Sequence, residues 1–169
     1  MRKYGDEVYK LQYYADDILG SEGMQYSKTN KHHGEVSVYN HSVDVALISL
    51  KLARRFRIKV DEKSLVRGAL LHDYYLYDWH EPDESHRLHG FSHAKKAFIN
   101  ASKDFDLNDI EKDIIIKHMF PLNLSLPVYK ESVLVCLADK ISATKDYSKQ
   151  MTWVKEHKEA LKNYIKANR

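Results

Sequence analysis

Apolar residues recur at helical spacing along most of this 169-residue chain. The first such segment repeats them at every third or fourth position, which places one set on a single helical face: Tyr4, Val8, Leu11, Ala15 and Ile18. We find no convincing run of alternating apolar and polar residues, the pattern of a half-exposed strand. The sequence therefore predicts an all-α fold of about seven helices. These helices cover about residues 3–19, 39–56, 62–72, 89–103, 106–118, 128–144 and 151–167.

The segment between the first two predicted helices, residues 21–38, is polar and turn-like. A loop of this length is uncommon in a compact domain and is frequently functional or mobile. We interpret it either as an ordinary surface loop or as a lid over a site.

Length and composition fit one soluble domain over residues 1–169. No stretch approaches the roughly 20 apolar residues of a membrane-spanning helix, and the N-terminus lacks the apolar segment of a signal peptide. The lone Cys136 allows no intramolecular disulfide, which suits a reducing compartment. We therefore expect a cytoplasmic protein with no membrane partner, and the sequence leaves its oligomeric state open.

The net charge of +3 is mildly basic, and the lysines and arginines are scattered. The densest cluster, Arg54, Arg55 and Arg57, is either a solvated helix face or a phosphate-handling patch. Dedicated nucleic-acid binders gather their basic residues on one face or in a run. We therefore expect no stable nucleic-acid partner.

Five separate segments place a histidine or an aspartate on, or at the end of, an apolar helical face. The residues are His41, the adjacent pair His72–Asp73, His89, His118 and Asp139. A buried ionisable group is costly unless it is paired or bound to a metal. Imidazole and carboxylate groups can satisfy one another through a shared ion. The pattern therefore favours a metal site where the helices converge.

The order and apolar context of these residues resemble the HD superfamily of metal-dependent phosphohydrolases. The resemblance covers about residues 39–145 and implies an all-α fold, in agreement with the periodicity. The motifs that carry it are NHSVDVALISLKLARR, GALLHDYYLYDW, HGFSHAKKA, IIIKHMFP and VCLADKISAT.

The resemblance implies a ligand set for one or two divalent ions. The first ion is expected on His41, His72, Asp73 and Asp139. In similar proteins that bind a second ion, two further histidines match His89 and His118, and Asp73 bridges both ions. We expect His72 and Asp73 to be the catalytic pair. Ligation rich in histidine favours Mn, Fe, Co, Ni or Zn over Mg, which prefers oxygen ligands.

The resemblance further implies a hydrolase that cleaves a phosphoester, for which we expect a nucleotide or a related small phosphorylated metabolite. A bound divalent ion lowers the pKa of its water from about 15.7 toward about 7 and acts as a Lewis acid, so the attacking group is a metal-activated water. Two alternatives stay open: a di-iron oxygenase of the same superfamily, and a non-catalytic nucleotide-sensing module.

Several neighbouring residues have open roles. His93, one helical turn after His89, is a further ligand of the second ion, a phosphate contact or a packing residue. Lys140, Lys95 and Lys96 either add positive charge near a phosphate or are solvated. The aromatic segment after the His-Asp pair either stacks on a nucleobase or packs in the core, and its members are Tyr74, Tyr75, Tyr77 and Trp79.

Overall fold

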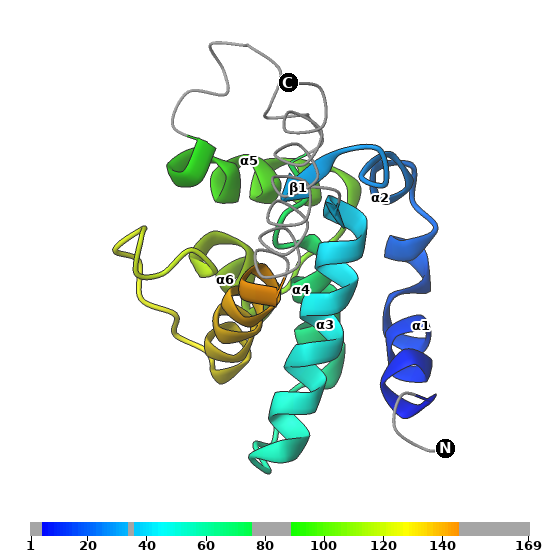
Figure 1. The fold of residues 1–169 in the computed structure, drawn as a ribbon, viewed down its shortest axis with the longest axis vertical. Helices are drawn as coiled ribbons and strands as arrows, with labels where there is room; N and C mark the ends of the chain where they lie inside the picture. The colour runs from blue at the N-terminus through cyan, green and yellow to red at the C-terminus, as the bar shows by residue number, and fades with distance from the viewer. Residues whose placement is uncertain (1–4, 34–35, 76–88, 146–169) are drawn as a thin grey trace, which may run out of the picture.

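The computed structural model describes residues 5–33, 36–75 and 89–145, and this part of the chain is almost entirely helical (Figure 1). The helices are α1 (Gly5–Leu19), α2 (Glu22–Tyr26), α3 (Val38–Arg55), α4 (Glu62–Leu71), α5 (His89–Asp104), α6 (Asp109–Lys117) and a further helix over residues 130–145. The all-α prediction is confirmed. The helix predicted over residues 151–167 lies outside the described residues.

Side-chain caps fix where the central helices begin. Ser37 accepts a hydrogen bond from the Asn40 amide at the start of α3, and Asp61 caps α4 in the same way. Helix α6 begins at Asp109, later than predicted, because Asn108 and Glu111 form a reciprocal capping box.

Helix α4 lies at the centre of the fold and contacts α1, α3, α5 and α6 (Figure 1). Every described side chain from Ser64 to Leu71 is buried. Gly68 allows α6 to approach closely, since a Cβ there would lie 2.5 Å from Cδ1 of Ile114. The C-terminal end of α4 is thus fixed in the middle of the molecule, where His72 and Asp73 follow.

The prediction of a long loop over residues 21–38 is wrong. This segment contains α2, capped by Ser21, and a small antiparallel pair of strands, β1 (Lys31–His33) and β2 (Val36–Ser37). Helix α2 packs on the core because its Met24 is buried and because Gly23 leaves room for the hydroxyl of Tyr74. The segment is therefore an ordered part of the fold.

The predicted inner face of α1 is confirmed at Leu11, Ala15 and Ile18 and is wrong at Val8, while Tyr4 lies outside the described residues. Val8 is 42% exposed, and Glu7 is buried in its place. Glu7 lies 2.6 Å from the guanidinium of Arg54 on α3, so its buried carboxylate has a cationic partner.

Within the described residues, no helix combines the length and the apolar character needed to cross a membrane.

Candidate metal centre

Five elements bring six ionisable side chains together around the end of α4. His41 lies in the first turn of α3, and His72 and Asp73 follow α4. His93 comes from α5, His118 follows α6, and Asp139 lies on the helix over residues 130–145. All six are buried. Since buried ionisable groups are costly without partners, their convergence needs a physical reason.

His72 and His118 are held in equivalent ways at the ends of two different helices. Nδ1 of His72 donates a hydrogen bond of 2.7 Å to the carbonyl of Ala69. Nδ1 of His118 donates one of 2.9 Å to the carbonyl of Ile115. Each bond assigns the proton of the neutral ring to Nδ1 and leaves the lone pair on Nε2. A backbone partner of this kind orients the histidines of metal sites.

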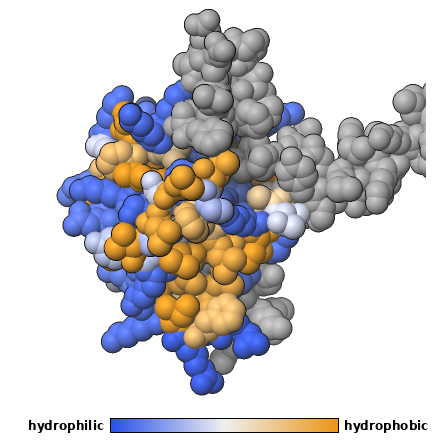
Figure 2. Space-filling model, turned by 90° about the vertical axis from the view of Figure 1, so that its left-hand side faces the viewer, coloured by the Kyte–Doolittle hydropathy of each residue, from blue (hydrophilic) through white to orange (hydrophobic). Residues whose placement is uncertain are grey.

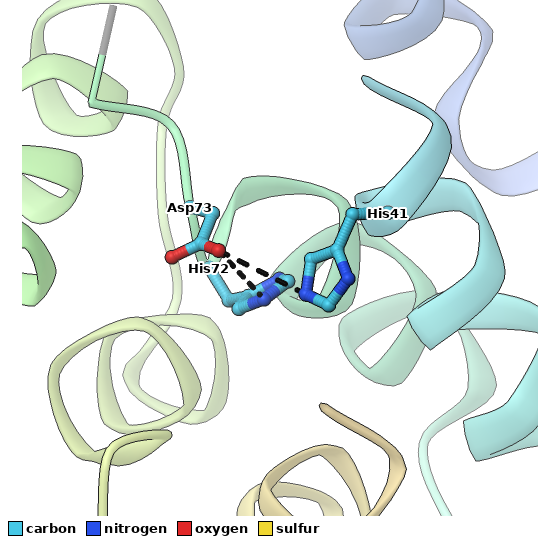
Figure 3. Close-up of side chains that lie close together, drawn as sticks. All are labelled: His41, His72 and Asp73. Atoms are coloured by element: carbon cyan, nitrogen blue, oxygen red, sulfur yellow. Dashed lines mark ion pairs between the residues drawn. The ribbon is translucent and has the colours of Figure 1, made fainter. Parts of the chain in front are cut away.

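The first group consists of His41, His72 and Asp73, whose ligand atoms lie within 4.8 Å of one another (Figure 3). Oδ2 of Asp73 is 3.4 Å from Nε2 of His72 and 3.9 Å from Nε2 of His41. Asp139 lies beside this group, with Oδ1 3.0 Å from His41 Nε2 and 3.8 Å from His72 Nε2. The four residues surround one small volume.

The second group consists of Asp73, His93 and His118. Here Oδ1 of Asp73 faces the rings, 3.3 Å from Nε2 of His93 and 3.4 Å from Nε2 of His118. The two Nε2 atoms are 2.9 Å apart. Asp73 therefore directs one carboxylate oxygen to each group.

The electrostatics of the cluster show how its buried charges are balanced. Burial disfavours a charge on His72, but the carboxylates of Asp73 and Asp139 outweigh it and raise the pKa of His72 to about 10. Burial also disfavours ionised Asp139, yet the hydrogen bond from His41 and the nearby imidazole of His72 hold the pKa of Asp139 well below its usual range. Burial lowers the pKa of His118, and Asp73 only partly offsets this. A proton on His72 supplies positive charge that the carboxylates require.

The ligand types and spacings fit divalent ions. Two atoms bound to one ion by bonds of about 2.0–2.2 Å lie roughly 2.8–3.6 Å apart when the bonds are near perpendicular or tetrahedral. The separations in the second group, 2.9–3.4 Å, fall in this range. Imidazole with carboxylate is a ligand set typical of Zn, Fe, Ni and similar ions.

The family model described as HD domain matches residues 38–144, more than half of the chain. The chain belongs to the HD domain family. Most HD domain proteins are metal-dependent hydrolases, and HD domains bind divalent metals. Comparison with curated proteins and with solved structures gave no match.

Five of the six residues expected as ligands of an HD domain lie in or beside the two groups: His41, His72, Asp73, His118 and Asp139. The sixth, His89, begins α5, but its side chain lies outside the described residues. His93, whose role the sequence left open, lies in the second group. Its position one turn after His89 was the only signal in the sequence, and spacing within one helix cannot show which histidine reaches Asp73.

The three lysines whose roles the sequence left open, Lys140, Lys95 and Lys96, differ in their surroundings. Nζ of Lys140 donates hydrogen bonds to the carbonyls of His118 and Cys136, at 3.2 Å and 3.3 Å. Lys140 thus contacts the backbone of a candidate ligand. Lys95 is exposed and Lys96 is half-buried on α5. Their phosphate-binding roles stay predictions.

The aromatic residues next to the His-Asp pair divide into two sets. Tyr74 is buried, packs its ring 5.7 Å from that of Phe105 and donates a hydrogen bond to Asp104. Tyr75 is also buried, 6.0 Å from the His93 ring. Both belong to the packing around the site, so neither offers a face to a nucleobase. Tyr77 and Trp79 lie outside the described residues.

Proposed function

We propose that this HD domain protein is a metal-dependent phosphohydrolase that cleaves a phosphoester of a nucleotide or a related small phosphorylated metabolite. The observation that carries the proposal is the position of Asp73. Its two carboxylate oxygens face two separate groups of histidines, 3.4 Å from His72 on one side and 3.3 Å from His93 on the other. This arrangement suits a carboxylate shared by two ions.

The proposed ligands form two sets, one for each ion, and Asp73 belongs to both. His41, His72, Asp73 and Asp139 would hold one ion, and Asp73, His93 and His118 would hold the other. When bound, divalent ions lower the pKa of water at such a site and offset the negative charge of the phosphoryl oxygens. The chain's own contribution is preorganisation, because the carbonyls of Ala69 and Ile115 hold His72 and His118 with Nε2 inward.

The histidine-rich ligand set supports Mn, Fe, Co, Ni or Zn as the resident ion rather than Mg. The proposal of a nucleotide substrate rests on the sequence alone. Tyr74 and Tyr75 are buried in the packing around the site, so neither ring is available to stack on a nucleobase. The single cysteine allows no intramolecular disulfide, which supports a location in the reducing cytoplasm.

The test measures phosphate release from nucleotides, sugar phosphates and dinucleoside polyphosphates in the presence of each of these metals and of Mg. We expect metal-dependent release by the wild-type chain and its loss, by about 1,000-fold or more, in Asp73→Ala. Asp109→Ala is the matched control, since this carboxylate is exposed on α6. Asp109→Ala should behave as the wild type. A folded, metal-loaded wild-type chain that releases no phosphate from any of these substrates would contradict the proposal.

The same observation also supports a second candidate, an oxygen-activating enzyme with two iron ions. A carboxylate between two histidine groups would serve an iron pair equally well. Oxygen consumption by the iron-loaded chain with a candidate substrate, without phosphate release, would favour this candidate.

A further inference from the structure

We propose that this chain has a second ligand site, which binds a free aliphatic amino acid in a cavity between α1 and α3. The N-terminal end of α1 and the C-terminal end of α3 lie side by side (Figure 1), and the cavity between them has a volume of about 330 Å³. Pockets for small metabolites begin at about this size. His41 and Arg54 lie near opposite ends of α3, so roughly 20 Å of helix separates the cavity from the candidate metal centre.

The wall of the cavity is aliphatic. Leu50 and Ala53 of α3 contribute to it, together with Ile58 and Val60 from the segment after this helix. The molecule also presents a broad apolar surface on the side where the segment after α6 lies (Figure 2). The cavity differs from that surface because charged side chains surround its aliphatic wall. Those charges indicate what kind of ligand would fit.

Some of the charged residues around the cavity are paired with one another. Nζ of Lys10 lies 2.7 Å from Oε1 of Glu62 and 3.8 Å from Oδ2 of Asp6. The guanidinium of Arg54 lies 2.6 Å from Oε1 of Glu7. These contacts are made within the chain, so a ligand would have to meet the groups that remain.

Two cations of the lining remain without a partner in the described part of the chain. The side chains of Arg57 and Lys59 make no hydrogen bond or ion pair with any described residue. A guanidinium can bind a carboxylate through two parallel hydrogen bonds, and an ammonium can add a third contact. We therefore expect the ligand to carry a carboxylate or a similar anionic group.

The backbone at Arg57 supports a role for its side chain. The amide of Arg57 donates to the carbonyl of Arg54, and the amide of Ile58 donates to that of Ala53, so α3 ends in a Schellman motif. The left-handed residue of this motif is Arg57, with a φ of 55°, at the position that glycine usually fills. A side chain is disfavoured in this conformation. A function of the guanidinium would explain why an arginine stands there.

Glu7 supplies the opposite charge. It is 3% exposed, and its Oε2 accepts no hydrogen bond from the described residues. A buried carboxylate oxygen without a donor lowers the stability of the fold, and the ammonium of a ligand would provide that donor. An α-amino acid carries an ammonium and a carboxylate on one carbon, and so offers a partner to Glu7 and to Arg57 at the same time.

An amino acid fits these charges better than a phosphate does. The carboxylates of Asp6, Glu7 and Glu62 line the cavity together with its cations, so they would repel an anion that carries two charges and no cation. An aliphatic amino acid has no net charge, and its side chain would cover the aliphatic wall at Leu50 and Val60.

The test is isothermal titration calorimetry of the full chain with L-leucine, L-isoleucine and L-valine. We expect at least one of them to bind with a Kd below about 1 mM. The amide of that amino acid lacks the carboxylate, and its deaminated acid lacks the ammonium, so each should bind at least about 10-fold more weakly. Inorganic phosphate should not compete with the amino acid.

Arg57→Gly is the decisive variant. Glycine favours the backbone conformation of this residue, so the variant should fold at least as stably as the wild type, yet its affinity for the amino acid should fall by about 10-fold or more. Arg55→Ala is the matched control, since it removes a neighbouring exposed guanidinium that does not line the cavity, and it should bind as the wild type does. Glu7→Gln should reduce the preference for the amino acid over its deaminated acid.

A wild-type chain that binds none of the three amino acids at about 10 mM would overturn the proposal, as would displacement of the amino acid by phosphate. Equal affinities for the amino acid and its two analogues, unchanged binding in Arg57→Gly, or equal losses in Arg57→Gly and Arg55→Ala would also contradict it. Asp73→Ala should bind the amino acid normally, so the outcome does not depend on the proposed hydrolase activity. Loss of binding in Asp73→Ala would instead place the ligand at the metal centre.

Discussion

Two clusters of charged and titratable residues lie along α4 and directly after it. They differ in whether the chain itself supplies the cation that balances their carboxylates. Near its middle, Arg67 lies 3.0 Å from Glu111 of α6 and donates two hydrogen bonds of 2.8 Å to Asp17 of α1. At its end, His72 and Asp73 meet three more histidines and Asp139.

The first cluster contains its own cation. Burial raises the pKa of Glu111, and Arg67 works against that rise. The second cluster holds two buried carboxylates among histidines, and a proton on His72 supplies the charge. A cluster whose carboxylates are balanced by an arginine of the chain serves to join helices. A cluster of carboxylates and histidines that needs an added cation is suited to binding a metal.

The largest effect we expect concerns the first cluster. Arg67→Met should lower the free energy of unfolding by about 3–5 kcal/mol, because it leaves the carboxylate of Glu111 buried without its cation. Urea denaturation would measure the change, and the variant should still bind metal. The double variant Arg67→Met/Glu111→Gln should recover a large part of the loss, because glutamine carries no charge and can still complete the capping box with Asn108. Equal destabilisation in the single and double variants would show that the ion pair is not the cause.

An added metal should stabilise the second cluster and leave the first unaffected. At a free Mn²⁺ or Zn²⁺ concentration of about 100 times Kd, the unfolding free energy should rise by about 2.7 kcal/mol. The same gain is expected in Arg67→Met, and EDTA should reverse it. Asp73→Ala should gain far less, since this change removes a ligand from both groups. A rise of the same size in Asp73→Ala would place the stabilising ion elsewhere.

Sequence patterns predicted the helices and the main candidate ligands because both depend on local spacing and on apolar context. His41 and Asp139 could be assigned from the helical faces that they share with Val45 and Val135. The role of His93 could not, because it depends on how α5 is placed against α6. Arg67 gave no signal either, since an arginine on a helix is usually exposed and its two partners are far away in the sequence.

The misjudged loop has a similar explanation. Residues 21–38 are polar, and polarity indicated a loop, but α2 is fixed by the contact between Gly23 and Tyr74. The two are about 50 residues apart, so the contact has no local trace. Residues 122–128 alternate apolar residues with other residues, a pattern that the sequence analysis did not recognise, and they form no strand in the structure.

The smallest effect we expect concerns the anchoring of the segment after α6 and its dependence on pH. Asp113 is buried and binds the amides of Val128 and Tyr129. Burial alone would raise its pKa, but the ammonium of Lys117 and the hydrogen bonds from these amides outweigh burial and lower the pKa below the usual 3.8. The ionised carboxylate therefore stabilises the fold above pH 3.8 and loses this contribution as the pH falls through the lower folded value.

Asp113→Asn should accordingly cost about 1–2 kcal/mol near neutral pH, the size of hydrogen bonds made by a charged group. The difference from wild type should shrink as the pH falls below about 4, because both chains then present a neutral group. Urea unfolding at neutral and at acidic pH would measure both values. A deficit independent of pH would mean that the shape of the side chain matters here and its charge does not, so that Asp113 anchors Val128 and Tyr129 without electrostatic help.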